Sequence, residues 1–118
     1  MRKILIMLAL AAVFIIQMTP ASAKEVFVGS KYGLDFYVET SSIDVIFSSK
    51  FYVEVNEYSG DILEEVNEWK FYFENFGRAD DEWHFDYEYL GTNIPVSSSE
   101  LAAKILRACQ IHNAQISS

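Results

Sequence analysis

The chain has 118 residues and a formal net charge of −8, with 17 acidic side chains against nine basic ones. An acidic surface repels phosphate backbones and anionic lipid headgroups, so the charge balance excludes nucleic acid as an expected partner. Cys109 is the only cysteine, which excludes an internal disulfide. We expect Cys109 to be a small apolar residue on the buried face of a helix; an intermolecular bridge or a reactive thiol is the alternative.

Residues 1–23 have the three parts of a secretory signal peptide. Two basic residues follow the first methionine, thirteen apolar residues come next, and Ala21 and Ala23 form the small-x-small pattern that a signal peptidase cleaves. The apolar run is shorter than the roughly 18 residues of a bilayer-spanning helix. We therefore expect cleavage before Lys24 and a single exported domain, residues 24–118, located in the periplasm, at the cell surface or outside the cell and not spanning a membrane. This domain has seven basic and 17 acidic residues, a net charge of −10.

Between about residues 26 and 90, apolar and polar side chains alternate with a period of two. Successive side chains of a strand point to opposite faces, so each segment has one apolar and one polar face. Such a pattern is typical of antiparallel strands that are covered on one face only. The alternating apolar positions are Leu34, Phe36, Val38, Phe51, Val53, Val55, Trp69, Phe71, Phe73, Trp83, Phe85, Tyr87 and Tyr89.

Turn-forming residues divide this region into five or six strands in a meander. We expect a polar turn at 40–44, followed by a separate short strand at 45–47. Residues 62–68 begin the strand that contains Trp69, with a bulge, although their acidic side chains also suit a helical turn. A turn at 77–81 then precedes the last strand, 82–90.

The carboxy-terminal segment changes to a helical period, and we expect one amphipathic helix over about 98–112. Ser97 and Glu100 fit the S-x-x-E capping box, in which each side chain accepts a hydrogen bond from the other residue's backbone N–H. The apolar side of this helix consists of Leu101, Ala102, Ile105, Leu106, Ala108 and Cys109. Because the apolar face of the sheet is the only large surface that can cover it, the sequence predicts an α+β fold with the helix packed on that face.

No motif indicates an enzyme, so we expect no catalytic residue, cofactor or metal ion. The chain lacks a phosphate loop, a metal-ligand cluster and a nucleophile elbow. His84 shares a predicted strand face with Glu82, Asp86 and Glu88, which could form a metal or proton-handling site, but a solvated polar face explains the same pattern. The acidic turn 80–82 lacks the spacing of a calcium loop and is interpreted as solvated too.

Three tyrosines mark the polar face of the predicted sheet, namely Tyr37, Tyr52 and Tyr72. Tyrosine combines an apolar ring with a polar hydroxyl and is enriched at protein interfaces. These residues are our candidate binding surface, with cross-strand stabilisation of the sheet as the structural alternative. A homodimer through this face is a further partner that the pattern allows.

The chain resembles the surface-adhesin family typified by bacterial surface protein E. The motifs that carry the resemblance are Val26-Phe27-Val28-Gly29-Ser30, Phe36-Tyr37-Val38, Thr40-Ser41-Ser42-Ile43, Ile94-Pro95-Val96, Ser99-Glu100-Leu101-Ala102 and Ile105-Leu106-Arg107-Ala108-Cys109. The resemblance implies an antiparallel sheet with a carboxy-terminal helix on one face, export, dimerisation and binding of host proteins. In the family, the cysteine that Cys109 resembles bonds a second cysteine in a mid-sheet strand, which this chain lacks.

Taken together, these features predict an exported, non-catalytic domain that binds a host or envelope protein. The alternative is a secreted or periplasmic inhibitor whose acidic surface docks onto a basic hydrolase, such as a lysozyme or a protease. The high negative charge favours the inhibitor, while the lack of a disulfide-braced loop disfavours it. A structural envelope component without a ligand is a third hypothesis.

Overall fold

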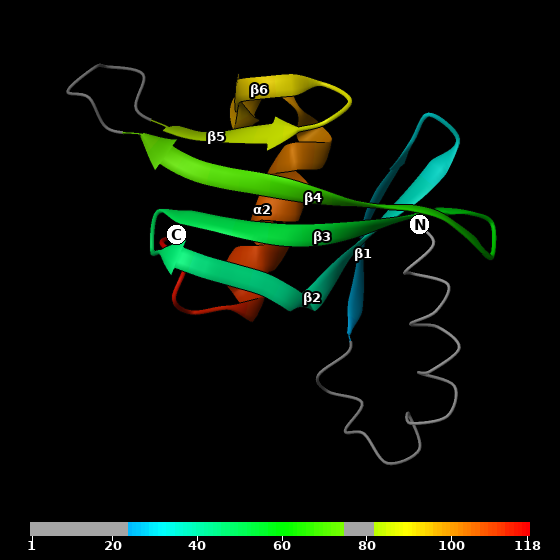
Figure 1. Ribbon diagram of the computed structural model, residues 1–118, viewed down its shortest axis with the longest axis horizontal. Helices are drawn as coiled ribbons and strands as arrows, with labels where there is room; N and C mark the ends of the chain where they lie inside the picture. The colour runs from blue at the N-terminus through cyan, green and yellow to red at the C-terminus, as the bar shows by residue number, and fades with distance from the viewer. Residues whose placement is uncertain (1–23, 75–81) are drawn as a thin grey trace, which may run out of the picture.

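The computed structural model describes residues 24–74 and 82–118, and in this part of the chain six antiparallel strands are followed by a helix (Figure 1). The sheet order is β1-β2-β3-β4-β5-β6, so each strand pairs with its neighbours in sequence. The elements are β1 (Glu25–Lys31), β2 (Leu34–Phe47), β3 (Lys50–Ser59), β4 (Ile62–Glu74), β5 (Glu82–Tyr87), β6 (Gly91–Pro95), the 3-10 helix η2 (Val96–Ser98) and the α-helix α2 (Glu100–His112). The predicted antiparallel meander with a carboxy-terminal helix is confirmed.

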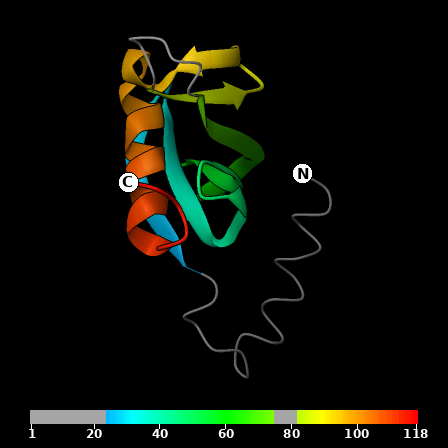
Figure 2. The same cartoon turned by 90° about the vertical axis from the view of Figure 1, so that its left-hand side faces the viewer.

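The sheet curls so that α2 lies against one of its faces, which we call the inner face (Figure 2). Alternating strand residues and one side of α2 meet there and form the core. The buried hydrophobic residues are Val28, Phe36, Val38, Phe51, Val53, Val55, Trp69, Phe71, Phe85, Tyr87, Val96, Leu101, Ala102, Ile105, Leu106, Ala108, Cys109 and Ile116. The predicted apolar side of the helix is therefore buried in full, and the two-sided character of the strands is confirmed, except that Tyr89 lies beyond the end of β5 and is exposed.

Stacked aromatic rings form the densest part of this core. The ring of Trp69 lies 4.0 Å from that of Tyr87 and 5.3 Å from that of Phe85, measured between centroids. Phe51 stacks on Phe71 at 5.2 Å. Because complete burial of one large apolar side chain stabilises a fold by about 1.5–3 kcal/mol, these rings supply much of the driving force for folding.

The predicted turn at 40–44 is wrong, because β2 continues through it to Phe47. The pairing of β2 with β3 shifts between Glu39 and Asp44, so the polar stretch is an irregularity within a long strand. Ser42 supplies the hydrogen bonds that the ladder loses there: its hydroxyl donates to the carbonyl oxygen of Glu39 at 2.6 Å and accepts from the backbone N–H of Glu54 at 2.8 Å. A side chain that substitutes for backbone partners allows the strand to continue.

The last predicted strand, 82–90, is also divided differently. β5 ends at Tyr87, and after a turn the short strand β6 returns beside it, with Gly91 opposite Tyr87 and Ile94 opposite Phe85. Residues of β6 alternate poorly and include two with positive φ, Gly91 at 121° and Asn93 at 56°. Its sequence therefore resembles a turn, and the number of strands agrees with the prediction although their boundaries do not.

The predicted capping box is wrong by two residues. Ser99 is the N-cap of α2, and its hydroxyl accepts from the backbone N–H of Ala102 at 3.1 Å. Ser97 instead belongs to η2, the 3-10 turn that follows Pro95. Because that turn already occupies Ser97, the next serine with an extended backbone becomes the cap.

Beyond α2, the chain returns to the sheet. Ile116 is buried, and the backbone N–H of Ser117 donates to the carbonyl oxygen of Ser48 in the turn between β2 and β3 at 2.8 Å. Within the described residues, no helix has both the length and the apolar character that a membrane crossing requires. The predicted signal peptide, with Ala21 and Ala23, and the predicted turn at 77–81 lie outside the described residues, and both stay predictions.

Candidate functional site

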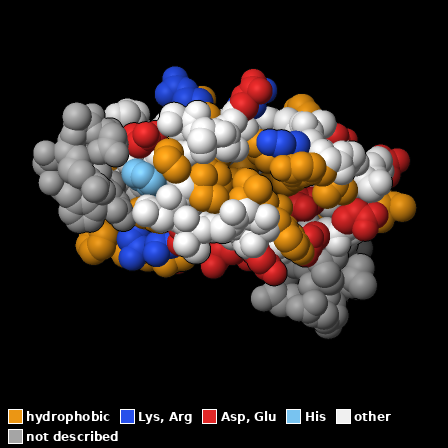
Figure 3. All heavy atoms as spheres, turned by 90° about the horizontal axis from the view of Figure 1, so that it is seen from above, with side chains coloured by type: hydrophobic (Ala, Val, Ile, Leu, Met, Phe, Trp, Pro, Cys, Tyr) orange, Lys and Arg blue, Asp and Glu red, His pale blue; other side chains and the backbone are white. Residues whose placement is uncertain are grey.

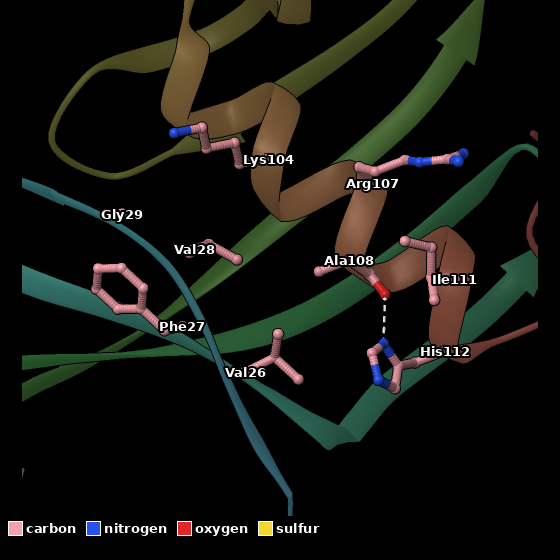
Figure 4. A pocket seen from close by; sticks show the side chains of 9 residues that line it. All are labelled: Val26, Phe27, Val28, Gly29, Lys104, Arg107, Ala108, Ile111 and His112. Carbon is pink, nitrogen blue, oxygen red and sulfur yellow. Dashed lines mark hydrogen bonds between the residues drawn. The ribbon is translucent and has the colours of Figure 1, made fainter.

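A groove of about 400 Å³ runs between β1 and α2 (Figure 4). The strand contributes Val26 and Val28, whose side chains lie on the side of the helix, while Lys104 and Arg107 extend from the helix. A smaller pocket of about 260 Å³ adjoins the groove at Val28 and Lys104 and extends to Lys31 and the beginning of α2. The groove therefore follows the strand along most of its length.

The strand side of this groove is the edge of the sheet, because within the described residues only β2 pairs with β1. The carbonyl oxygen of Lys24 accepts from the backbone N–H of Thr40 at 2.9 Å, and Val26 lies opposite Val38. Hydrogen-bonded and non-hydrogen-bonded pairs alternate in an antiparallel ladder, so the backbone groups of Glu25 and Phe27 point away from β2. These groups are a free template for pairing with another extended segment.

A bulge in β1 limits the regular part of this edge. The register with β2 shifts between Phe27 and Gly29, and Gly29 has a φ of 153°. A side chain at this position would begin 3.6 Å from the side chain of Leu101, so glycine leaves the strand close to the helix. The regular edge is thus the segment before Gly29.

The helix side of the groove is basic, although the protein as a whole has a net charge of −8. Lys104 lies 3.8 Å from the carboxylate of Glu100, one turn earlier on α2. Arg107 forms no ion pair with any residue in the described part of the chain. His112 closes the far end, where its Nδ1 lies 2.9 Å from the carbonyl oxygen of Ala108 (Figure 4). The groove is therefore a local positive site on an acidic protein.

Two exposed apolar side chains flank the groove. Phe27 is 55% exposed and Ile111 is 62% exposed. Single exposed apolar residues are ordinary, but here both lie beside the same strand edge: Ile111 on the helix wall of the groove, and Phe27 on the face of β1 that points away from α2 (Figure 4). They give an incoming segment apolar surface to cover in addition to the strand edge.

The structure does not gather the three predicted tyrosines into one site. Tyr37 lies between the rings of Phe27 and Tyr58, at 5.3 Å from each. Tyr52 is half-buried and lies opposite Lys70, two residue pairs away from the Lys50–Tyr72 pair on the same ladder. Tyr37 therefore packs on Phe27 on the outer face of the sheet, and the other two lie farther along the sheet.

Tyr72 belongs to a polar cluster on the outer face. Its hydroxyl donates to Asp86 at 2.8 Å, and the ammonium of Lys70 lies 5.1 Å from the centre of its ring. The ring of His84 stacks against Tyr72, and its Nδ1 lies 3.0 Å from the carbonyl oxygen of Glu82. Among the described residues, no three His, Cys, Asp or Glu side chains are arranged to hold a metal ion.

Cys109 lies on the buried side of α2 with no exposed surface. Burial raises the pKa of its thiol to about 12, so the thiol is protonated at neutral pH. Both features agree with a packing role and disfavour a reactive thiol.

The groove residues were not predicted from the sequence. Lys104, Arg107 and Ile111 lie outside the apolar side that the sequence predicts for the helix. The sequence contains part of the signal for the groove. Ile111 is apolar but lies outside the predicted buried side of the helix, which indicates a second apolar surface on α2. The other part, that β1 is an edge strand beside α2, follows only from the sheet topology.

No protein-family model, no curated protein sequence and no solved structure matches the chain. The resemblance to the surface-adhesin family therefore stays a prediction from its short motifs.

Proposed function

We propose that the protein is an exported, non-catalytic domain that binds another protein by taking an extended, acidic segment of it as an added strand beside β1. The observation that carries this proposal is the meeting, in one groove, of a free strand edge with two basic residues of α2, Lys104 and Arg107, as far as the described residues go. Backbone pairing would supply affinity, and the groove would select the side chains of the partner.

The backbone part of the proposal depends on Glu25 and Phe27. Each has one N–H and one carbonyl group directed away from β2, which is what an antiparallel or a parallel neighbour needs. A segment paired there has every second side chain on the side of α2, between Val28 and Ile111. An extended peptide with apolar residues at alternate positions would fit this arrangement.

Charge determines which partner is favoured. Lys104 and Arg107 lie along the groove, so acidic side chains of the partner would meet positive charge there, whereas the rest of the acidic surface would repel them. Such local complementarity chooses the docking place and speeds encounter more than it adds affinity. The alternative role, inhibition of a basic hydrolase, gains no support from the groove because its charge has the wrong sign for that partner.

Export and a host or envelope partner are part of the same proposal. They are supported by the signal-like residues 1–23 and by the motifs that resemble the surface-adhesin family. Cys109 is disfavoured as a catalytic nucleophile, because its thiol is buried and protonated at neutral pH.

The test is a titration of the isotope-labelled protein, followed by amide NMR, with two eight-residue peptides. One peptide alternates valine with glutamate, and the other alternates valine with lysine. We expect saturable shifts at Glu25 and Phe27 with the acidic peptide, weakened when salt is raised from about 0.05 to about 0.5 M, because screening shortens the reach of exposed charges. Equal binding of the basic peptide would exclude the charge part of the proposal.

Two matched variants separate backbone pairing from side-chain contact. Phe27→Pro removes the outward N–H, and proline is tolerated on an edge strand, so we expect loss of peptide binding in a folded protein. Phe27→Val keeps the N–H and should bind with similar affinity. If the proline variant binds as the wild type does, strand addition at β1 is wrong.

A further inference from the structure

A second cavity, of about 450 Å³, lies at the end of the sheet where β3 turns into β4. It is bounded by the β1–β2 hairpin and by the turn between β5 and β6, which lie on the same side of β4 in Figure 1. Its apolar wall consists of Tyr32, Leu34, Phe36 and Leu90. The face drawn in Figure 3 has hydrophobic side chains along its middle and acidic side chains beside them towards one end. This cavity is separate from the groove, and the inference goes beyond the proposed function.

A buried carboxylate lines the cavity. Glu57 is only 2% exposed, and two donors hold one of its oxygens: the amide of Asn67 at 2.7 Å and the hydroxyl of Tyr87 at 2.9 Å, both to Oε2. Among the described residues no group donates to Oε1. Because Tyr87 stacks on the fully buried Trp69, the carboxylate is fixed in one orientation.

A second carboxylate lies beside the first. Glu65 is directly opposite Glu57 in the pairing of β3 with β4, and the hydroxyl of Tyr89 donates to it. Like charges directly opposite on one face of a sheet are destabilising. No lysine, arginine or histidine of the described residues lines the cavity, and the ammonium of Lys31 lies outside it, 5.3 Å from the ring centre of Tyr32. The cavity thus has two acceptors and an apolar wall without an internal cation.

These features select one chemical class of ligand. A calcium ion is disfavoured because it takes about six to eight oxygen ligands, whereas the cavity offers two carboxylates beside an apolar wall. A ligand with N–H donors, positive charge and an alkyl chain would satisfy the free oxygen, offset the repulsion and cover the wall. Aromatic rings such as those of Tyr32 and Tyr89 also attract cations.

We propose that this cavity binds a primary alkylammonium group, which donates hydrogen bonds to Oε1 of Glu57 and to the carboxylate of Glu65 while its alkyl chain contacts Leu34 and Leu90. The group has two sources, a free amine or the lysine side chain of a peptide, which share the same chemistry.

The test is calorimetric titration of the protein with n-pentylammonium, with 1-pentanol as the neutral probe of the same length. We expect saturable binding of the ammonium and none of the alcohol at equal concentration. Nα-acetyl-lysine N-methylamide is the third probe, and tighter binding of it than of n-pentylammonium identifies a peptide lysine as the source. Binding of the alcohol as tight as that of the ammonium would overturn the proposal, because the apolar wall alone would then explain it.

Three variants with the same loss of charge locate the site. Glu57→Gln should weaken n-pentylammonium binding by about tenfold or more, because a charge-assisted hydrogen bond is lost, and Glu65→Gln should weaken it as well. Glu64→Gln is the matched control, since Glu64 is exposed on the same strand and does not line the cavity. Equal losses in Glu57→Gln and Glu64→Gln, or no loss in either cavity variant, would show that the ammonium does not occupy the cavity. The acidic-peptide titration of the groove is unaffected by these results, so the two proposals fail separately.

Discussion

Glu57 and Glu65 lie directly opposite each other on β3 and β4, and each accepts a hydrogen bond from a tyrosine hydroxyl. Burial raises the pKa of Glu57, and the negative charge of Glu65 raises it further, while the hydrogen bonds from Asn67 and Tyr87 act in the opposite direction. The repulsion between the two carboxylates destabilises the folded state when both are charged, so stability should depend on pH.

We expect the stability of the protein to change with pH through Glu57. Between the ordinary value of 4.5 and the raised pKa, the folded chain keeps a proton on Glu57 that the unfolded chain has released. The free energy of unfolding contributed by this group is therefore largest at low pH and falls as pH rises through that window. Glu57→Gln does not titrate, so its free energy of unfolding should rise relative to that of the wild type between pH 4.5 and neutral pH.

Urea denaturation at several pH values measures this difference. Glu54→Gln is the control, because Glu54 is exposed on the outer face of the same strand. Parallel curves for Glu57→Gln and the wild type would contradict the raised pKa.

The N-cap of α2 is the subject of a second prediction. Ser99→Ala removes the acceptor for the backbone N–H of Ala102 and should lower the free energy of unfolding by about 0.5–2 kcal/mol. Ser97→Ala, in η2, should change it by less than about 0.5 kcal/mol, as surface substitutions usually do. Thermal unfolding of the two variants compares them, and a larger effect at Ser97 would restore the capping box that the sequence predicts.

The tip of the β1–β2 hairpin contains a strained residue. Tyr32 has a φ of 58° and Gly33 a φ of 77°, the two positive values of a type I′ turn. Asparagine adopts this conformation far more readily than tyrosine, so Tyr32→Asn should stabilise the protein by about 1 kcal/mol. Gly33→Ala should destabilise the protein by a similar amount although the site is sterically open, because alanine disfavours the positive φ of this position. Chemical denaturation tests both signs, and equal stability of all three proteins would refute the assignment of strain.

The buried thiol gives a fourth prediction. Since the pKa of Cys109 is raised to about 12 and its side chain has no exposed surface, a thiol reagent at neutral pH should modify it only after unfolding. Cys109→Ser places a hydroxyl among apolar neighbours and should cost about 1–3 kcal/mol, more than Cys109→Ala. Labelling rates with and without urea, read by mass spectrometry, decide the point; rapid labelling of the native protein would show an accessible thiol.

Most of the fold could be predicted from the spacing of apolar residues within single segments of the chain. The alternation of Phe51, Val53 and Val55 with polar neighbours places them on one face whatever the partners are, and the helical spacing of Leu101 and Ile105 does the same for α2. Strand ends were predicted less well, because a side chain such as Ser42 can replace the lost ladder bonds, and no local rule shows when it does.

The two binding sites could not be predicted, since each depends on pairing between distant segments. Alternation along β3 continues from Val55 to Glu57 and so places Glu57 on the inner face. The hydrogen-bond partners of Glu57, Asn67 and Tyr87, come from two other strands. A register shift next to Glu57 decides which residue of β4 lies opposite. Likewise, the groove exists because β1 is an edge strand beside α2, which the sequence does not show. Periodicity within a single strand predicts only which face a residue occupies, and the candidate tyrosines were chosen on that basis alone.

The hydrogen bond between Ser117 and Ser48 has a practical consequence for attaching the protein to a surface or a reporter. It holds the carboxyl end beside the β2–β3 turn, where the label C lies in Figure 1. Glu57 lies nine residues farther along the chain from Ser48, roughly 30 Å away for an extended strand. A linker fused after Ser118 would therefore leave from the opposite end of the molecule and keep the mouth of the carboxylate cavity open to solutes.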